Sequence, residues 1–303
     1  MDNIKSKIQS LKQEKNAIIL AHYYQNPDIK QIADYVGDSY YLSKIAKEAK
    51  EDLIVFCGVK FMAESAKILS PQKKVLLPNA DAGCPMADMA DMGKILKLKE
   101  QHPDAAVVCY INSPVEVKAL CDVCVTSSNA VDIISKMPQS KIIFLPDQNL
   151  CAYIASQCPD KEFITYPGYC IVHNEIIPED ILDLKECHPS APVVAHPECR
   201  KEVLALADFI GSTAAMLEYA TSSSCTELII VTEEGLRYEL EKLNPSKTFY
   251  FPTRTPMLCV NMKKTNLEDV LWTLEYGTNE ILIDENIRQK AFSCLENMHR
   301  LGK

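Results

Sequence analysis

The sequence has no apolar run long enough to cross a membrane and no excess of basic residues. A spanning helix needs about 18 or more consecutive apolar residues, and no such run occurs in this chain of 303 residues. The net charge is -9, and an acidic surface lacks the basic stripe that nucleic-acid phosphates require. The first residues form a charged amphipathic segment rather than a secretory signal. We therefore expect a cytoplasmic protein with neither membrane nor nucleic-acid partners.

Cysteines are numerous, at 13, but they do not form a disulfide pattern. An odd number in a chain without an export signal argues against a disulfide framework. Several of them, such as Cys57, Cys109 and Cys124, lie inside apolar runs, as buried free thiols do. We expect most cysteines to be inert core thiols, which leaves metal binding or catalysis for a minority.

Three copies of one unit are present in the chain. Residues 100–122 match residues 186–208 without a gap at 11 of 23 positions, and residues 17–39 form a weaker third copy. An aspartate coincides in all three copies, and a proline followed two residues later by a lysine recurs further along each copy. The coinciding residues are Asp34, Asp122 and Asp208, then Pro71, Pro159 and Pro245, then Lys73, Lys161 and Lys247.

Each copy alternates charged helical segments with apolar runs of four to six residues, which is typical of parallel sheets covered by helices. We expect an α/β fold of three homologous αβα units with parallel sheets, arranged about a pseudo-threefold axis. The units are placed at residues 1–88, 89–173 and 174–262. Residues 263–303 do not repeat. They predict a helix near residues 267–276, a strand at 280–284 and a final helix, packing back on the first unit.

One cysteine lies at an equivalent loop position in each copy: Cys84, Cys170 and Cys259. Residues at equivalent positions of three units can meet at a threefold axis. A structural zinc site normally has four protein ligands, commonly from CxxC pairs, whereas here each thiolate comes alone. Three lone thiolates fit a 4Fe-4S cluster with one open iron, which can act as a Lewis acid on a substrate oxygen.

Polar residues follow the first strand of each copy, where ligands of parallel α/β sheets gather. His22, Tyr110 and His196 are equivalent, and two residues later come Tyr24, Asn112 and Glu198. A spacing of two on extended chain places both side chains on one side. A lone histidine at a strand end is more often structural, but three equivalent polar pairs favour a common cavity.

A third set of equivalent residues, Ser39, Ser127 and Thr213, lies at predicted helix starts. Ser212 precedes Thr213, as Asp38 and Thr126 precede the other two. Helix capping explains such residues singly. Three helix N-termini facing one axis would also form a receptor for a small polyanion. His173, three residues after Cys170, is expected to reach the same cavity.

Two further cysteine features invite other interpretations. Cys121 and Cys124 form a CxxC that resembles a redox or zinc motif, but the equivalent positions in the other copies are apolar, which favours core packing. Cys199 aligns with non-cysteine residues and is interpreted as a bystander near the site. His102 and His188 precede prolines in turns and are expected to be structural.

These motifs resemble those of the quinolinate synthase family along essentially the whole chain. The matching segments are AHYYQ (21–25), GDS (37–39), GCPMAD (83–88), YINS (110–113), TSSNAV (126–131), GYCIVH (168–173), HPEC (196–199), GST (211–213) and CVNMKK (259–264). No departure is found at a position that the family uses for chemistry.

The resemblance implies that iminoaspartate condenses with dihydroxyacetone phosphate to give quinolinate, with loss of phosphate and water. It implies a 4Fe-4S cluster on the three equivalent cysteines and suggests functional coupling to L-aspartate oxidase, which would supply the imine. From their chemistry, we expect Glu198, Tyr24, His196 and Tyr110 to be the catalytic residues. Substrate binding is expected from His22, Ser39, Tyr110, Asn112, Ser127, His173, His196, Glu198, Ser212 and Thr213.

Two other functions use the same features. A hydro-lyase of the aconitase kind also combines three thiolates with an open iron, on different small acids. A non-catalytic iron-sulphur sensor would load a cluster without turnover, although a sensor has no need of so many polar groups in one cavity.

Overall fold

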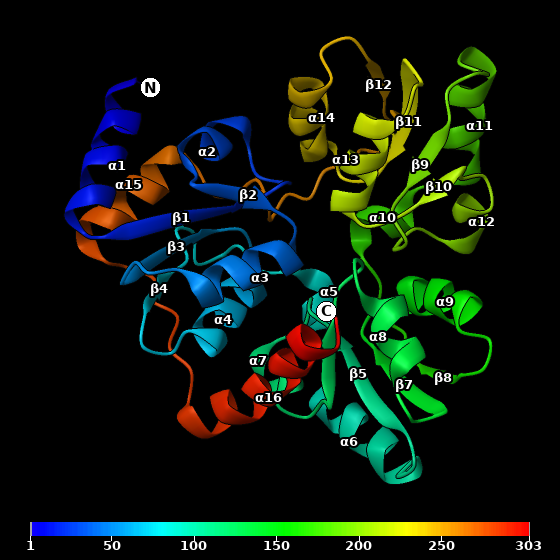
Figure 1. Cartoon of the computed structure of the whole chain (residues 1–303), viewed down its shortest axis with the longest axis horizontal. Helices are drawn as coiled ribbons and strands as arrows, with labels where there is room; N and C mark the ends of the chain where they lie inside the picture. The colour runs from blue at the N-terminus through cyan, green and yellow to red at the C-terminus, as the bar shows by residue number, and fades with distance from the viewer. Residues whose placement is uncertain (1, 303) are drawn as a thin grey trace.

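The computed structural model describes residues 2–302 and contains three parallel sheets of four strands each, in three lobes (Figure 1). Each sheet has the same strand order, in which the second strand of the unit is at one edge, followed by the first, third and fourth. The expected α/β fold with three parallel sheets is confirmed. In sheet order, the strands are β2 (Tyr35–Gly37), β1 (Ala17–His22), β3 (Leu53–Cys57) and β4 (Lys74–Leu76); β6 (Val123–Val125), β5 (Ala106–Tyr110), β7 (Lys141–Leu145) and β8 (Glu162–Thr165); β10 (Phe209–Ile210), β9 (Val193–Ala195), β11 (Glu227–Val231) and β12 (Thr248–Tyr250).

Helices connect the parallel strands in each unit. Across residues 2–302, none of them is long and apolar enough to cross a membrane. The helices are α1 (Asp2–Glu14), α2 (Pro27–Ile32), α3 (Ser39–Glu48), α4 (Lys60–Leu69), α5 (Pro85–Asp88), α6 (Met92–Gln101), α7 (Val115–Lys118), α8 (Ala130–Lys136), α9 (Gln148–Gln157), α10 (Ile171–Glu175), α11 (Pro178–Cys187), α12 (Lys201–Leu204), α13 (Thr213–Ser222), the 3-10 turn η1 (Glu234–Leu236), α14 (Arg237–Leu243), α15 (Leu267–Tyr276) and α16 (Glu285–Leu301).

The recurring aspartate has one structural task in all three units. Its carboxylate accepts a hydrogen bond from a backbone N–H of the first strand, and its own N–H donates to the carbonyl of that same strand residue. The pairing therefore fixes the entry of the second strand beside the first. The carboxylate distances are 2.8 Å from Asp34 to Ile19, 2.7 Å from Asp122 to Val107 and 2.7 Å from Asp208 to Val193.

The recurring lysine also has one task. Its ammonium donates to two backbone carbonyls at the end of the helix that precedes the third strand, where unpaired carbonyls and the negative end of the helix dipole favour a cation. The contacts are Lys73 to Ala49 and Glu51, Lys161 to Met137 and Gln139, and Lys247 to Ala220 and Ser223.

The non-repeating tail covers parts of two units. Helix α15 packs on α1 and β3 of the first sheet. Helix α16 packs on β6 and α7 of the second unit and on α4 of the first, and it buries Cys294, Leu295 and Met298 (Figure 1). The predicted strand at residues 280–284 is wrong. Only one antiparallel bridge, Leu76 to Glu280, forms there, and the chain then turns away with the side chain of Leu282 80% exposed.

Candidate functional site

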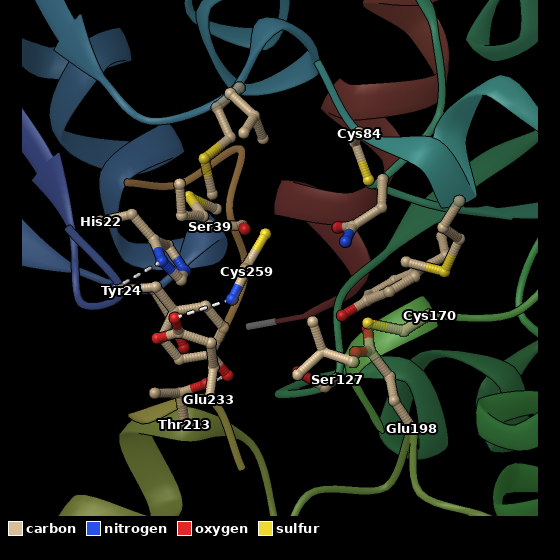
Figure 2. A pocket seen from close by; sticks show the side chains of 18 of the residues that line it. His22, Tyr24, Ser39, Cys84, Ser127, Cys170, Glu198, Thr213, Glu233 and Cys259 are labelled. Carbon is tan, nitrogen blue, oxygen red and sulfur yellow. Dashed lines mark hydrogen bonds between the residues drawn. The ribbon is translucent and has the colours of Figure 1, made fainter. Parts of the chain in front are cut away.

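One cavity lies where the carboxyl ends of the first strands of all three sheets meet (Figure 2). All of the residues predicted for the site except Ser212 line it. Ser212 instead accepts a hydrogen bond from the N–H of Ala215 and caps α13. The predicted residues in the lining are His22, Tyr24, Ser39, Cys84, Tyr110, Asn112, Ser127, Cys170, His173, His196, Glu198, Thr213 and Cys259.

The three cysteine loops are anchored in the same way. In each unit one backbone hydrogen bond links the cysteine loop to the end of the third strand. The donor is the N–H of the residue three positions after that strand, and the acceptor is the carbonyl of the residue two positions before the cysteine. The pairs are Lys60 to Ala82 at 2.8 Å, Gln148 to Gly168 at 2.8 Å and Glu234 to Met257 at 2.7 Å. This repeated bond brings all three cysteines to equivalent places beside the cavity.

The three sulphur atoms point into the cavity from different sides (Figure 2). Each sulphur accepts backbone N–H groups from the turn that follows it: Cys84 from Ala87 and Met86, Cys170 from His173, and Cys259 from Met262 and Asn261. Such donors favour a thiolate.

Burial acts against the thiolate in the protein alone. It raises the pKa of Cys84 to about 12 and also raises the pKa values of Cys170 and Cys259. A bound metal displaces thiol protons, so three buried thiols with N–H donors fit a soft metal group such as an iron-sulphur cluster.

Two buried carboxylates accept hydrogen bonds from the backbone N–H groups of two of these cysteines. The sequence did not predict either carboxylate for the site. Asp147 accepts the N–H of Cys170 at 3.1 Å, and Glu233 accepts the N–H of Cys259 at 3.1 Å. Both side chains are inaccessible to solvent. They are equivalent residues, two positions after β7 and β11, and Val59 takes this place in the first unit. An alignment of the third strands would have shown them.

A chain of hydrogen bonds runs from Tyr24 to Glu198. The hydroxyl of Tyr24 shares hydrogen bonds of 2.9 Å with both Thr213 and Thr232. Thr232 in turn bonds to Nε2 of His173 at 3.0 Å, and Nδ1 of His173 lies 2.7 Å from Oε2 of Glu198. Thr232 is fully buried and was not predicted for the site.

On the opposite side, Glu198 continues this chain into the second unit. Its carboxylate is hydrogen-bonded to the hydroxyl of Tyr110, which is also hydrogen-bonded to Ser127. Potential metal ligands of Cys170, His173 and Glu198 all lie within 4.8 Å of one another. Nδ1 of His173 brings them together, since it lies 2.7 Å from Oε2 of Glu198 and 3.3 Å from Sγ of Cys170.

Electrostatics separate the protonation states of the site. Burial lowers the pKa of His22 and of His196 to about 3. Burial disfavours the charged form of Glu198, but His196 and His173 outweigh it and lower the carboxyl pKa to about 2. Burial raises the pKa values of Tyr24 and Tyr110 well above 10. At neutral pH Glu198 is therefore ionised, His22 and His196 are neutral, and the phenols of Tyr24 and Tyr110 are protonated.

The predicted helix starts are correct in two units and wrong in the third. Ser39 and Thr213 are the first residues of α3 and α13, capped by Asp38 and Ser212. Ser127 instead lies in a turn, because Asn129 accepts the N–H of Thr126 at 2.7 Å and α8 begins only after Asn129.

Two polar atoms in the lining have no partner among the described residues: Oδ1 of Asn112 and Oγ1 of Thr126. Both are buried, and a buried polar atom without a hydrogen bond costs about 1–3 kcal/mol. A bound molecule that donates to these atoms would remove that cost. They lie on the Ser127 side of the cavity, so this side fits a polar ligand.

The remaining cysteines and histidines singled out in the sequence lie outside the lining. Cys124 is fully buried in β6, and Cys121 donates to the carbonyl of Val117. Cys199 is buried in the core of the third unit, and His188 stacks on Tyr250 with ring centroids 3.5 Å apart.

The histidine pKa values predict a loss of stability in mild acid. The unfolded chain takes up protons at His22 and His196 near pH 6.5, whereas the folded chain does not until about pH 3. The unfolded state binds more protons between these values, so the free energy of unfolding falls as the pH falls, by up to about 1.4 kcal/mol per pH unit per histidine.

We expect His22→Gln to lose less stability than the wild type between pH 6 and pH 4.5. The measurement is urea unfolding of the metal-free protein at both pH values. An equal loss in the two proteins would show that His22 is not held neutral by burial.

Comparisons with known proteins agree along nearly the whole chain. A family model described as "Quinolinate synthetase A protein" matches residues 6–300. A curated "Quinolinate synthase" from Clostridium perfringens (strain SM101 / Type A) is 57% identical over 300 residues, covering 99% of each chain. One from Clostridioides difficile (strain 630) is 54% identical over 296 residues, covering 98% of this chain and 97% of the relative. The chain therefore belongs to the quinolinate synthase family and is an enzyme of this kind.

Proposed function

We propose that this enzyme condenses iminoaspartate with dihydroxyacetone phosphate to form quinolinate, with loss of phosphate and water. The main support is the convergence of three equivalent cysteines and a set of equivalent polar side chains on one cavity. Full-length relatives named quinolinate synthase support the same reaction. The pseudo-threefold arrangement remains part of the proposal, supported by the identical strand order and cysteine anchors of the units.

Cys84, Cys170 and Cys259 would hold a 4Fe-4S cluster, leaving one iron without a protein ligand. When bound, such a cluster supplies a Lewis acid for a substrate oxygen. The donor set supports this assignment, because each unit contributes one buried thiol with backbone N–H donors and the rest of the lining contains no cysteine.

The cavity would bind anionic substrate groups without a cationic side chain. Within the described chain, no lysine or arginine belongs to its lining. The starts of α3 and α13, at Ser39 and Thr213, present backbone N–H groups and the positive ends of helix dipoles, which favour phosphate or carboxylate. Ser127, Asn112 and His22 would add hydrogen bonds from the remaining sides.

Proton transfer is assigned to Glu198 and Tyr24. Glu198 is ionised at neutral pH and suits a general base, while the phenol of Tyr24 stays protonated and suits an acid. The chain through Thr232 and His173 connects the two and offers a path that returns the proton from base to acid. His196 stacks on His173 with ring centroids 4.7 Å apart, and Tyr110 holds the other side of the Glu198 carboxylate.

Interrupting this chain gives a direct prediction. Thr232→Val keeps the shape of the side chain but removes its hydroxyl, so Tyr24 and His173 lose their link. We expect kcat to fall about tenfold or more, within the range of general acid-base effects. Thr265→Val is the matched control, because Thr265 is fully buried outside the cavity lining and its hydroxyl has no partner among the described residues. Equal kcat values in the two variants would contradict a role for Thr232.

The substrate assignment is tested by supplying dihydroxyacetone phosphate with freshly generated iminoaspartate to the anaerobically reconstituted enzyme and measuring quinolinate by mass spectrometry. Omitting either substrate should abolish the product. Dehydration of citrate or another hydroxy acid in place of quinolinate formation would favour a hydro-lyase of the aconitase kind. Cluster loading with neither activity would favour a sensor.

The same proposal includes a cytoplasmic location and supply of the imine by L-aspartate oxidase. An imine hydrolyses in water, so a source close in time and space is chemically reasonable. Adding that oxidase with aspartate, in place of preformed imine, is expected to support quinolinate formation.

A further inference from the structure

Two segments of the site that are far apart in sequence are joined by several contacts. The loop after β1 carries Tyr24, and the loop after β12 carries Cys259. The ammonium of Lys263 donates to the backbone carbonyl of Tyr24, 239 residues away. Gln25 donates to the carbonyl of Met262 at 2.6 Å, and Asn26 donates to the carbonyl of Lys263 at 3.2 Å.

Glu233 completes this connection. Its Oε1 lies 3.0 Å from Nζ of Lys263 and also accepts the backbone N–H of Cys259 at 3.1 Å. Its Oε2 accepts the N–H of Gly235 at 2.7 Å. The Glu233 carboxylate is fully buried and the Lys263 side chain is 17% exposed, so the ammonium is the charge partner of a carboxylate that water does not reach. One ion pair therefore contacts the backbone of both Cys259 and Tyr24.

The chain packs closely at Gly235, where the loop after β11 meets the loop after β1; we call this place the junction. A Cβ atom added there would lie 2.6 Å from Nζ of Lys263 and 2.7 Å from Cα of Tyr24. Both distances are shorter than real Cβ contacts, so a larger residue would require the Lys263 ammonium and the backbone at Tyr24 to shift. The junction thus requires glycine at this position.

We propose that Lys263 and Glu233 are positioning residues that couple the seating of Cys259 to the orientation of Tyr24. The roles of Cys259 and Tyr24 themselves rest on the proposed function. Lys263 lies outside the cavity lining. Both carboxylate oxygens of Glu233 are occupied by contacts with Lys263, Cys259 and Gly235. The pair acts on the reaction through the loops that it holds together.

Hydrogen exchange of the full-length protein, followed by mass spectrometry, tests the coupling without any need for turnover. Lys263→Met is expected to speed hydrogen exchange at least about tenfold, both at the amide of Cys259 and in the loop containing Tyr24. In the wild type, opening of either loop must break the ion pair, whereas the variant has no ion pair to break. Lys264→Met is the matched control. Its ammonium also donates to one backbone carbonyl, that of Asp81, but it is exposed and touches neither Tyr24 nor Glu233.

Kinetics add a second readout. In Lys263→Met we expect kcat to fall about tenfold while KM changes less than about threefold, because Tyr24 is misplaced but the anion-binding helix starts are intact. If the single variant does not fold, the double variant Glu233→Gln with Lys263→Met removes the stranded charge and should show the same exchange in both loops.

Exchange in both loops equal to that of Lys264→Met would overturn the proposal, as would faster exchange at Cys259 alone. Failure of the proposed function would look different. The wild type would form no quinolinate, whereas the exchange result would still report whether the two loops are coupled.

Discussion

Replacing any one of Cys84, Cys170 or Cys259 with alanine is expected to abolish stable cluster loading and, with it, quinolinate formation. Each unit provides a single thiol to the cavity, so the loss of one leaves two thiolates for a group that needs at least three. The N–H donors that stabilise each sulphur do not serve a neighbouring cysteine. The effect should therefore be nearly complete and similar in all three variants.

The measurement is iron and acid-labile sulphide per chain after anaerobic reconstitution, together with the absorbance of the cluster. Cys121→Ala and Cys199→Ala are the matched controls, because both cysteines lie near the site in sequence but outside the cavity lining. Both controls should load as the wild type does. Loss of the cluster in Cys121→Ala with normal loading in Cys84→Ala would show that the ligands are wrongly assigned.

Changing Glu198 to glutamine is expected to lower kcat by about 10²- to 10⁴-fold, the usual contribution of a general base. The substitution keeps the shape of the side chain and one hydrogen-bond acceptor for Tyr110 or His173. It removes the carboxylate that accepts hydrogen bonds from His173 and Tyr110. Cluster content and substrate binding should be retained, because the three cysteines are unchanged and the glutamine side chain still forms hydrogen bonds in the cavity.

Single-turnover assays at equal cluster content measure this effect. Glu64→Gln provides a control, since Glu64 is also a buried carboxylate but lies outside the lining and accepts the N–H of Val115. Its turnover should stay near that of the wild type. Near-normal turnover in Glu198→Gln would remove Glu198 from the mechanism.

The repeat explains why so much of the fold was predictable from the sequence. Asp34, Asp122 and Asp208 recur because each fixes the second strand beside the first, and the recurring lysines each bind helix-end carbonyls. Residues tied to such local tasks keep their spacing in every copy. The strand order and the cysteine positions follow from the same local register.

Contacts between units were not predictable in the same way. Thr232 aligns with Gly58 and Pro146, so no repeat marks it, and its task depends on Tyr24 from another unit. Lys263 lies in the tail that does not repeat. The helix start expected at Ser127 failed because the side chain of Asn129, a residue of the second unit alone, accepts the N–H of Thr126 and holds a turn before α8. Sequence periodicity reports what each unit does for itself, and the site depends also on where the units meet.

Quinolinate formation measured against cluster content, in one anaerobic preparation titrated with iron and sulphide, tests the central claim most directly. We predict no quinolinate from the cluster-free protein and a yield that rises in proportion to the 4Fe-4S content, up to one cluster per chain. Quinolinate formed at full rate by protein without a cluster, or none formed at full loading, would contradict the assignment of the three cysteines and of the cavity between them.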